Sequence, residues 1–359
     1  MAPKALIVPA WSTDPTAGTA RTALQRVANR PILCHVLERI QQAGLTEILL
    51  IVSEQEHAAV RGCLELEAPP ELEIEYLSFG QQNGAGEAWS RDAMGQALCD
   101  AADRVGEDAC LVHVAEGLLD QPLEPLLARS QGSGHELVVF ASQQEDSGSI
   151  GLATRRLLQL AQEAPQARPL DLAGAALFAP GALRHAARAR WWNAGALDLV
   201  AIAEQLVAAG GRLRVELVDG WQSHRGDVAG LLELNRIALD GARLGHPKAV
   251  GQETRVEGGA QIHPTASVQS STIVGPVIIG PGAVVLDSYI GPYTSIGDGV
   301  HIEGAEVERS IILPGAKIAH IGGRLVGSVV GRDAKVFRDF SLPRALRLNV
   351  GDGGEVALC

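Results

Sequence analysis

Residues 273–297 read IVGPVIIGPGAVVLDSYIGPYTSIG, and this stretch decides the architecture of the C-terminal part of the chain. Aliphatic residues recur in it at spacings of five or six, and several are followed directly by glycine. A hexapeptide repeat is typical of a left-handed parallel β-helix, in which each hexad forms one face of a triangular coil and points its aliphatic residue inward. The repeat extends in both directions, through Ile262, Val268, Val274, Ile279, Val285, Ile290, Ile296 and Ile302.

Three hexads make one coil of about eighteen residues, so the segment 262–335 has room for about four coils. We therefore expect residues 246–359 to form a β-helix followed by a C-terminal tail.

Toward the N-terminus the pattern changes to an alternation of strands and helices. Short aliphatic runs predict strands at 5–8, 47–52, 72–77, 109–114, 135–141, 170–178 and 212–218. Apolar residues at helical spacing predict helices at 31–43, 54–66, 86–105, 197–209 and 228–240. This order predicts an α/β domain over residues 1–245, a Rossmann-like, mainly parallel sheet with helices on both faces. Ligands of such sheets bind beyond the carboxyl ends of the strands.

The composition of the chain indicates which binding partners and which cellular location to expect. The 359 residues carry 42 acidic and 30 basic side chains, a net charge of −12, which argues against a nucleic acid or an anionic membrane as partner. We find no signal peptide and no apolar run long enough to cross a membrane, and expect a cytoplasmic protein. The five cysteines are scattered without a CxxC pair, so we expect reduced thiols.

Several longer stretches carry a family resemblance. They are VANRP at 27–31, AGLTEI at 43–48, GW at 220–221 with LLELNR at 231–236, and the tail from Ser288. Together they resemble the sugar-1-phosphate nucleotidyltransferases, above all the long glucose-1-phosphate thymidylyltransferases with a C-terminal β-helix. The resemblance implies attack of a sugar 1-phosphate on a nucleoside triphosphate, with release of pyrophosphate. It also implies Mg²⁺, a sugar phosphate or nucleotide sugar as ligand, and an oligomer.

The phosphate-binding positions of that family are altered here. Its glycine-rich loop after the first strand, GGxGTRL, is matched by residues 9–21, PAWSTDPTAGTAR, which lack the glycine pair. Arg21 is the remaining candidate for a phosphate clamp. Thr22 stands at the position of a lysine in that family, so the positive charge of that lysine is missing here.

The metal-binding positions are altered as well. The resemblance matches Ala115-Glu116 to a Gly-Asp pair whose carboxylate binds Mg²⁺, although Glu116 is also compatible with an ordinary loop residue. It matches His224 to the second carboxylate ligand, and imidazole is a poor ligand for Mg²⁺. Asp227 lies three residues on, so Glu116 and Asp227 are the candidate catalytic and metal residues.

The positions that accept sugar and base are better preserved. The resemblance matches Glu163, in Glu-Ala-Pro, to the glutamate that holds sugar hydroxyls, although the adjoining lysine is missing. It matches Gly151 to a glycine beside the sugar and Gly86 to one beside the nucleobase. We expect Gly86, Gly151 and Glu163 to bind substrate.

Three functions remain open at this point. The first is a catalytically silent regulatory or scaffolding subunit, as a homo-oligomer or bound to an active paralogue. The second is an active nucleotidyltransferase with a rebuilt site of Arg21, Glu116 and Asp227 with Mg²⁺. The third is an acyltransferase at the β-helix, which would need a histidine at a subunit seam; His263, His301 and His320 lack an evident acceptor loop.

Overall fold

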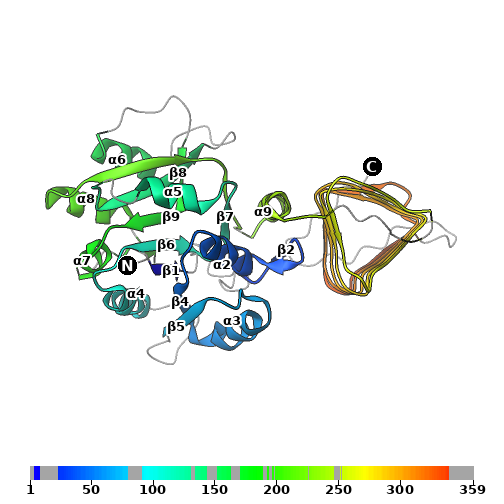
Figure 1. Ribbon diagram of the computed structural model, residues 1–359, viewed down its shortest axis with the longest axis horizontal. Helices are drawn as coiled ribbons and strands as arrows, with labels where there is room; N and C mark the ends of the chain where they lie inside the picture. Colours follow the sequence, from blue (N-terminus) through cyan, green and yellow to red (C-terminus); the bar gives the residue numbers. More distant parts are fainter. Residues whose placement is uncertain are drawn as a thin grey trace.

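The computed structural model describes residues 4–8, 23–79, 91–130, 134–143, 152–162, 170–188, 192–193, 196–197, 199–224, 226–245, 251 and 253–338. An α/β domain lies on one side and a triangular β-helix on the other, with α9 and β2 between them (Figure 1). Both bodies are the ones that the sequence predicts, whereas a division between residues 245 and 246 stays a prediction.

The centre of the α/β domain is a seven-stranded sheet in the order β12-β8-β9-β6-β1-β4-β5. All neighbours are parallel except β9, which runs antiparallel to β6 and β8. The mainly parallel Rossmann-like sheet is therefore confirmed. The strands are β1 (Lys4–Val8), β4 (Glu47–Ser53), β5 (Glu73–Phe79), β6 (Cys110–Val114), β8 (Leu137–Gln143), β9 (Leu170–Phe178) and β12 (Leu213–Val218).

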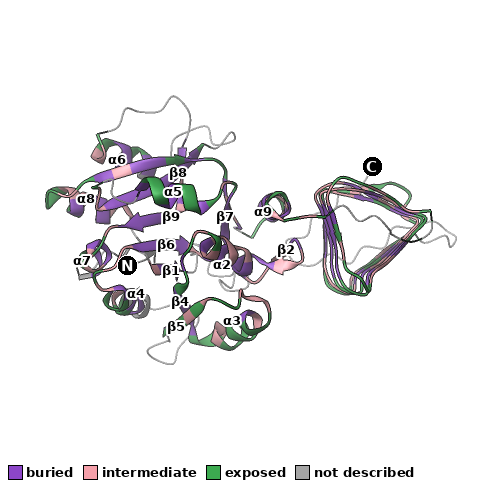
Figure 2. Ribbon diagram, viewed as in Figure 1, coloured by how far each residue is buried: buried purple, intermediate pink, exposed green. Residues whose placement is uncertain are grey.

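Helices cover both faces of this sheet, whose central strands are buried (Figure 2). A separate apolar cluster fills each side. The cluster on one face includes side chains from α2 (Ile32–Gln42), α3 (Glu54–Glu67), α5 (Leu123–Ser130) and α9 (Val228–Gly241). The other face carries α4 (Arg91–Val105), α6 (Leu152–Leu160), α7 (Ala182–Arg188) and α8 (Leu199–Ala208). No helix among the described residues is long and apolar enough to cross a membrane.

The helices α5, α6 and α7 were missed by sequence reasoning because they have only 8, 9 and 7 residues. Two turns of helix repeat an apolar position too few times for a period to be recognised. The predicted start of α4 at residue 86 lies outside the described residues.

Three two-stranded ladders accompany the main sheet. They are β2 (Arg26–Val27) with β3 (Arg30–Pro31), β10 (Trp192–Asn193) with β11 (Ala196–Leu197), and β7 (Gly117–Leu119) with β13 (Trp221–Ser223). The VANRP segment is thus a tight hairpin whose two central residues, Ala28 and Asn29, have φ angles of 46° and 62°. Positive φ at both central positions is typical of a type I′ turn.

The C-terminal body consists of three parallel sheets with five strands each, and every third strand joins the same sheet. This is the predicted left-handed parallel β-helix, and its triangular section is visible in Figure 1. It has five coils instead of about four, because strand pairing begins at Arg255, before the first recognised hexad. The strands are β14 (Arg255–Glu257), β15 (Ala260–Ile262), β16 (Ser267–Gln269), β17 (Thr272–Val274), β18 (Val277–Ile279), β19 (Val284–Leu286), β20 (Tyr289–Ile290), β21 (Thr294–Ile296), β22 (His301–Glu303), β23 (Glu306–Glu308), β24 (Ile311–Ile312), β25 (Lys317–Ala319), β26 (Arg324–Val326), β27 (Val329–Val330) and β28 (Lys335–Phe337).

An aliphatic column runs through these coils and includes most of the predicted hexad residues. Val274 is an exception, because Ile273 points into the column in its place and is fully buried. In the three-residue strand β17 the side chains alternate, so the central residue points inward and its neighbours do not.

Asn235 joins the two bodies. Its side chain is fully buried in α9; the Oδ1 atom accepts hydrogen bonds from Ala28 N and Ser295 Oγ, each at 2.8 Å, and the Nδ2 atom donates to Tyr293 O at 3.0 Å. Asn29 Nδ2 in the hairpin turn donates to Ile296 O at 2.6 Å. The hairpin, α9 and the β-helix therefore meet at one amide, which makes three hydrogen bonds.

Candidate active site

The candidate site begins where β6 ends, at the carboxyl edge of the parallel strands. Ala115 follows β6 directly, and its backbone N donates to Val8 O at the end of β1 over 2.8 Å. The chain then passes through Glu116 into the short strand β7. This is the edge at which ligands bind in sheets of this kind.

The ladder of β7 and β13 brings Glu116 and His224 together. Ser223 pairs with Gly117, and His224 N donates to Glu116 O at 3.0 Å, so the antiparallel register continues to these two residues. Directly opposed residues of an antiparallel pair leave the ladder on the same face, with Cβ atoms about 5 Å apart. Sequence reasoning named both residues but not their pairing, because three-residue strands give no readable alternation.

Trp221 is part of the ladder that carries this pair. Its indole is 6% exposed and lies so close to Gly117 and Gly174 that a Cβ atom at either glycine would overlap it. His113 of β6 packs edge-on against the same indole, with ring centroids 5.6 Å apart. The absence of side chains at Gly117 and Gly174 therefore leaves the space that the Trp221 indole occupies.

Both members of the pair are buried. Glu116 is 2% exposed and His224 is 8% exposed. The His224 Nδ1 atom is buried without a hydrogen-bond partner among the described residues. Burial lowers the pKa of His224, and nearby Asp227 partly opposes that shift, so the imidazole is neutral at pH 7.

Asp227 has a structural task of its own. It is the N-cap of α9, and its Oδ2 atom accepts a hydrogen bond from Gly230 N at 3.1 Å. An N-cap carboxylate satisfies a helical N–H group that has no partner within the helix. The carboxylate that sequence reasoning proposed as a replacement metal ligand is thus bound to the start of a helix.

The remaining predicted site residues lie outside the described residues. They are the proposed phosphate clamp Arg21 and the proposed substrate-binding residues Gly86, Gly151 and Glu163. Their roles stay predictions.

The donor set at the pair does not fit Mg²⁺. In the part of the chain that the structure describes, no group of three or more His, Cys, Asp or Glu side chains is placed to hold a metal ion. Glu116 supplies a carboxylate, but the position opposite it supplies an imidazole with a buried, unsatisfied nitrogen. Mg²⁺ selects oxygen ligands in near-octahedral geometry and is not held by such a pair.

Further cavities lie away from this site, among them a groove between the two bodies and a smaller cavity at the opposite edge of the sheet. A groove of about 1000 Å³ separates α2 and α9 from the β-helix, and most of its arginines are already paired. Arg26 binds Glu67 at 2.8 Å, Arg30 binds Glu38, and Arg39 donates to backbone carbonyls. The groove therefore lies between the two bodies and is lined by side chains that largely pair with each other.

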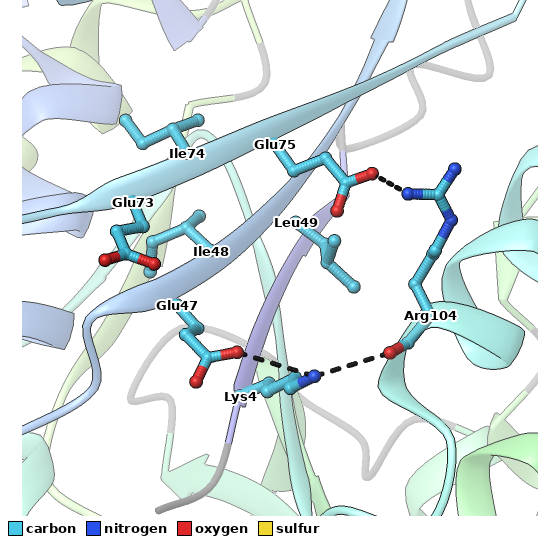
Figure 3. Close-up of a pocket in the computed structure, with 8 residues that line it drawn as sticks. All are labelled: Lys4, Glu47, Ile48, Leu49, Glu73, Ile74, Glu75 and Arg104. Carbon is cyan, nitrogen blue, oxygen red and sulfur yellow. Dashed lines mark hydrogen bonds and ion pairs between the residues drawn. The ribbon is translucent and has the colours of Figure 1, made fainter.

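The other cavity, of about 320 Å³, lies at the amino ends of β1, β4 and β5. Figure 3 shows Lys4 reaching Glu47 and the carbonyl of Arg104, whose guanidinium pairs with Glu75. Because ligands of parallel sheets bind at the opposite edge, we assign this cavity no role in the chemistry.

Comparison with known proteins places these features in a family. No family model matches the chain. The low-salt glycan biosynthesis nucleotidyltransferase of Haloferax volcanii is 30% identical over 353 residues, covering 96% of this chain and 96% of that protein. The glucose-1-phosphate thymidylyltransferase of Streptomyces antibioticus is 29% identical over 353 residues, covering 96% of this chain and 95% of that protein.

A solved structure described as a glucose-1-phosphate thymidylyltransferase from Bacillus anthracis, in complex with a sucrose, shares the fold of about two thirds of this chain. It superimposes with a TM-score of 0.51 at 19% identity and covers 68% of this chain and 98% of that chain. With a relative at 30% identity along almost its whole length, the chain belongs to the sugar-1-phosphate nucleotidyltransferase family.

Proposed function

We propose that this chain is a catalytically silent member of the sugar-1-phosphate nucleotidyltransferase family and acts as a regulatory or scaffolding subunit. The observation that carries the proposal is the pair of Glu116 and His224. A buried, neutral imidazole stands directly opposite the one carboxylate that remains at the expected metal position. Asp227, the nearest replacement, caps α9.

The sequence supports the same conclusion at the phosphate-binding positions. The glycine pair of the phosphate loop and two lysines are replaced, with Thr22 and Ala164 at the lysine positions. Each preorganised group that stabilises developing charge lowers the activation free energy by about 3 kcal/mol. The loss of several such groups therefore reduces turnover by many orders of magnitude. The apolar clusters and the β-helix column are intact, so the losses are confined to the chemistry.

A second candidate is an active sugar-1-phosphate nucleotidyltransferase with a rebuilt site. The burial of Glu116 at the carboxyl edge of the sheet favours it, because that carboxylate keeps its family position. In this alternative Glu116 and Asp227 bind Mg²⁺ and Arg21 binds phosphate.

Pyrophosphate release separates the two candidates. The purified, folded chain is given Mg²⁺, glucose 1-phosphate and each of dTTP, UTP, ATP, CTP and GTP, beside the Streptomyces antibioticus thymidylyltransferase as positive control. We expect no release above background. Turnover that disappears in Glu116→Gln would overturn the proposal and establish the second candidate.

The subunit role has its own test. A silent subunit needs a protein to act on, and the predicted partners are a second copy of this chain or an active paralogue. Light scattering of the chain alone, and after co-expression with an active family member from the same genome, reports the assembly. A strictly monomeric chain that alters neither the mass nor the turnover of that enzyme would contradict the role.

A further inference from the structure

Two thiols, those of Cys34 and Cys63, lie together where α2 meets α3. Cys34 is in the first turn of α2 and is fully buried, whereas Cys63 is in the second half of α3 and is half-buried. Cys34 belongs to the apolar cluster on this face of the main sheet, and Cys63 packs against the same cluster. Both are free thiols, and a hydrogen bond joins their side chains. The two sulfur atoms are therefore direct neighbours.

Ionic contacts beside the pair hold the two helices to each other. Glu67 lies four residues after Cys63, so the two side chains are on one face of α3. Arg26 Nη1 binds Glu67 Oε1 at 2.8 Å, and Arg30 Nη2 donates to Glu67 O at 3.1 Å. Arg30 is two residues before the first residue of α2. The face of α3 that carries Cys63 is thus docked on the start of α2, where Cys34 lies.

The surroundings make the two thiols unequal. The hydrogen bond from Cys34 lowers the pKa of Cys63, an effect that burial and Glu67 oppose and Arg26 supports. The same hydrogen bond, together with burial, raises the pKa of Cys34. The thiolate is the nucleophilic form of cysteine, and a partly exposed thiolate is accessible to small oxidants. Cys63 can therefore supply the attacking sulfur, with Cys34 as a second thiol next to it.

We propose that Cys34 and Cys63 form a redox modification site that closes into a disulfide when the chain meets a hydroperoxide such as hydrogen peroxide. In the first step the Cys63 thiolate attacks one peroxide oxygen and the O–O bond breaks. Cys63 becomes a sulfenic acid, and the other oxygen leaves as hydroxide, which takes up a proton to give water.

In the second step the Cys34 sulfur attacks the sulfenic sulfur of Cys63. The S–S bond forms, the S–O bond breaks, and the hydroxyl leaves as water with the proton of Cys34. Two thiols and one peroxide thus give one disulfide and two waters, and a dithiol reductant restores both thiols. The inference goes beyond the proposed function, because it concerns neither the metal-binding nor the phosphate-binding positions.

The test uses the full-length chain, reduced, freed of reductant and treated with hydrogen peroxide. The thiol count in denaturant should fall from five per chain to three, because one disulfide consumes two thiols. Tryptic digestion without reductant should release peptide 27–39 joined to peptide 62–91, and dithiothreitol should separate them. An unchanged thiol count, or a disulfide that joins any other pair of cysteines, would overturn the proposal.

Single variants assign the two roles. Cys34→Ala removes the second thiol, so Cys63 should stay a sulfenic acid and be labelled by dimedone. Cys63→Ser should lose the disulfide and show no label at Cys34. Cys99→Ser is the matched control, since Cys99 is also half-buried and its Sγ atom donates to Ala187 O at 3.5 Å. Loss of the disulfide in Cys99→Ser, or dimedone labelling of Cys34 in Cys63→Ser, would contradict the assignment.

A measurement on the wild type alone does not depend on any variant folding. With limiting iodoacetamide at neutral pH, followed by mass spectrometry of the digest, Cys63 should be alkylated several-fold faster than Cys99, because its thiolate is stabilised by Cys34. Equal rates at the two residues would count against Cys63 as the attacking thiol. None of these readouts is turnover, so the outcome is distinct from that of the pyrophosphate assay.

Discussion

Trp221 illustrates at the residue scale how one large side chain positions smaller ones. Its indole lies over Gly117 and Gly174 and against His113, in the ladder that carries the Glu116–His224 pair. Any atom added at the two glycines has to displace the ring. The packing of the ladder around Trp221 therefore depends on two glycines that have no side chain.

We expect Gly117→Ala to destabilise the folded chain by about 1–3 kcal/mol, because the new methyl group overlaps the indole of Trp221. Gly62→Ala is the matched control, since Gly62 is in α3 and has open space around its Cα atom. That control should be stabilising by about 0.5–1 kcal/mol. Urea unfolding of the three proteins measures both values, and equal stability of Gly117→Ala and wild type would contradict the packing argument.

His113 makes stability depend on pH. It is 3% exposed, its Nδ1 atom lies 2.6 Å from Val114 O, and burial lowers its pKa from 6.5 to about 4. Because the folded pKa lies below the unfolded one, the contribution is complete above pH 6.5 and is lost as the pH falls toward 4. The full loss is about 3 kcal/mol.

The measurement is the free energy of unfolding in urea at pH 7 and pH 5. Wild type should lose about 2 kcal/mol between these values from this residue alone. His113→Gln, which does not titrate, should lose correspondingly less. The same pH dependence in both proteins would show that His113 is not the group responsible.

At the scale of single elements, α9 connects the candidate site to the β-helix. It begins at Asp227, three residues after His224, and carries Asn235 in its middle. Arg236 on the same helix binds Asp120 at 2.8 Å, just beyond the end of β7. The helix is therefore connected to β13 through the chain and to the end of β7 through the Arg236–Asp120 ion pair.

Substitutions at Asp227 distinguish a helix cap from a metal ligand. Asp227→Ala should cost about 1 kcal/mol of stability, and Asp227→Ser should recover most of it, since a hydroxyl also caps a helix. Thermal unfolding measures both. A stability gain on adding Mg²⁺ that is present in wild type and absent in Asp227→Ser would instead assign the carboxylate to a metal.

The elements that the sequence predicted correctly are those long enough to show a period. The helix at α2 and the strand at β4 came within two residues of their true bounds, because each contains at least four buried apolar positions. The ladder of β7 and β13 has three residues a side and no such pattern. As a result, Glu116 and His224 were recognised by type and position, but their pairing required the structure.

At the scale of the whole molecule, polar and apolar contacts join the two bodies. Asn235 and Asn29 supply four hydrogen bonds between the hairpin, α9 and the β-helix. The β-helix column is a cluster separate from the two clusters that flank the main sheet. Ile278 and Ile311 on the outside of the β-helix nevertheless belong to the cluster that contains α2 and α9, so the joint between the bodies is both polar and apolar.

We expect Asn235→Leu to destabilise the joint by about 2–4 kcal/mol, because it leaves Ala28 N and Ser295 Oγ buried without their acceptor. Calorimetry should then resolve separate transitions for the β-helix and the α/β domain. Glu233→Ala, on the same helix with its side chain 40% exposed, is the control and should change stability by less than about 1 kcal/mol. A single unshifted transition in Asn235→Leu would show that the joint lies elsewhere.

The position of Trp221 also makes the site observable by light. A buried indole with an imidazole 5.6 Å from it emits at short wavelength, and that emission is quenched when the imidazole gains a proton. The difference in fluorescence between wild type and Trp221→Phe isolates this signal from the other four tryptophans. Protonation of His113, or a shift of the β7–β13 ladder that carries Trp221 and the Glu116–His224 pair, then changes the colour or intensity of this emission, without a label and without turnover.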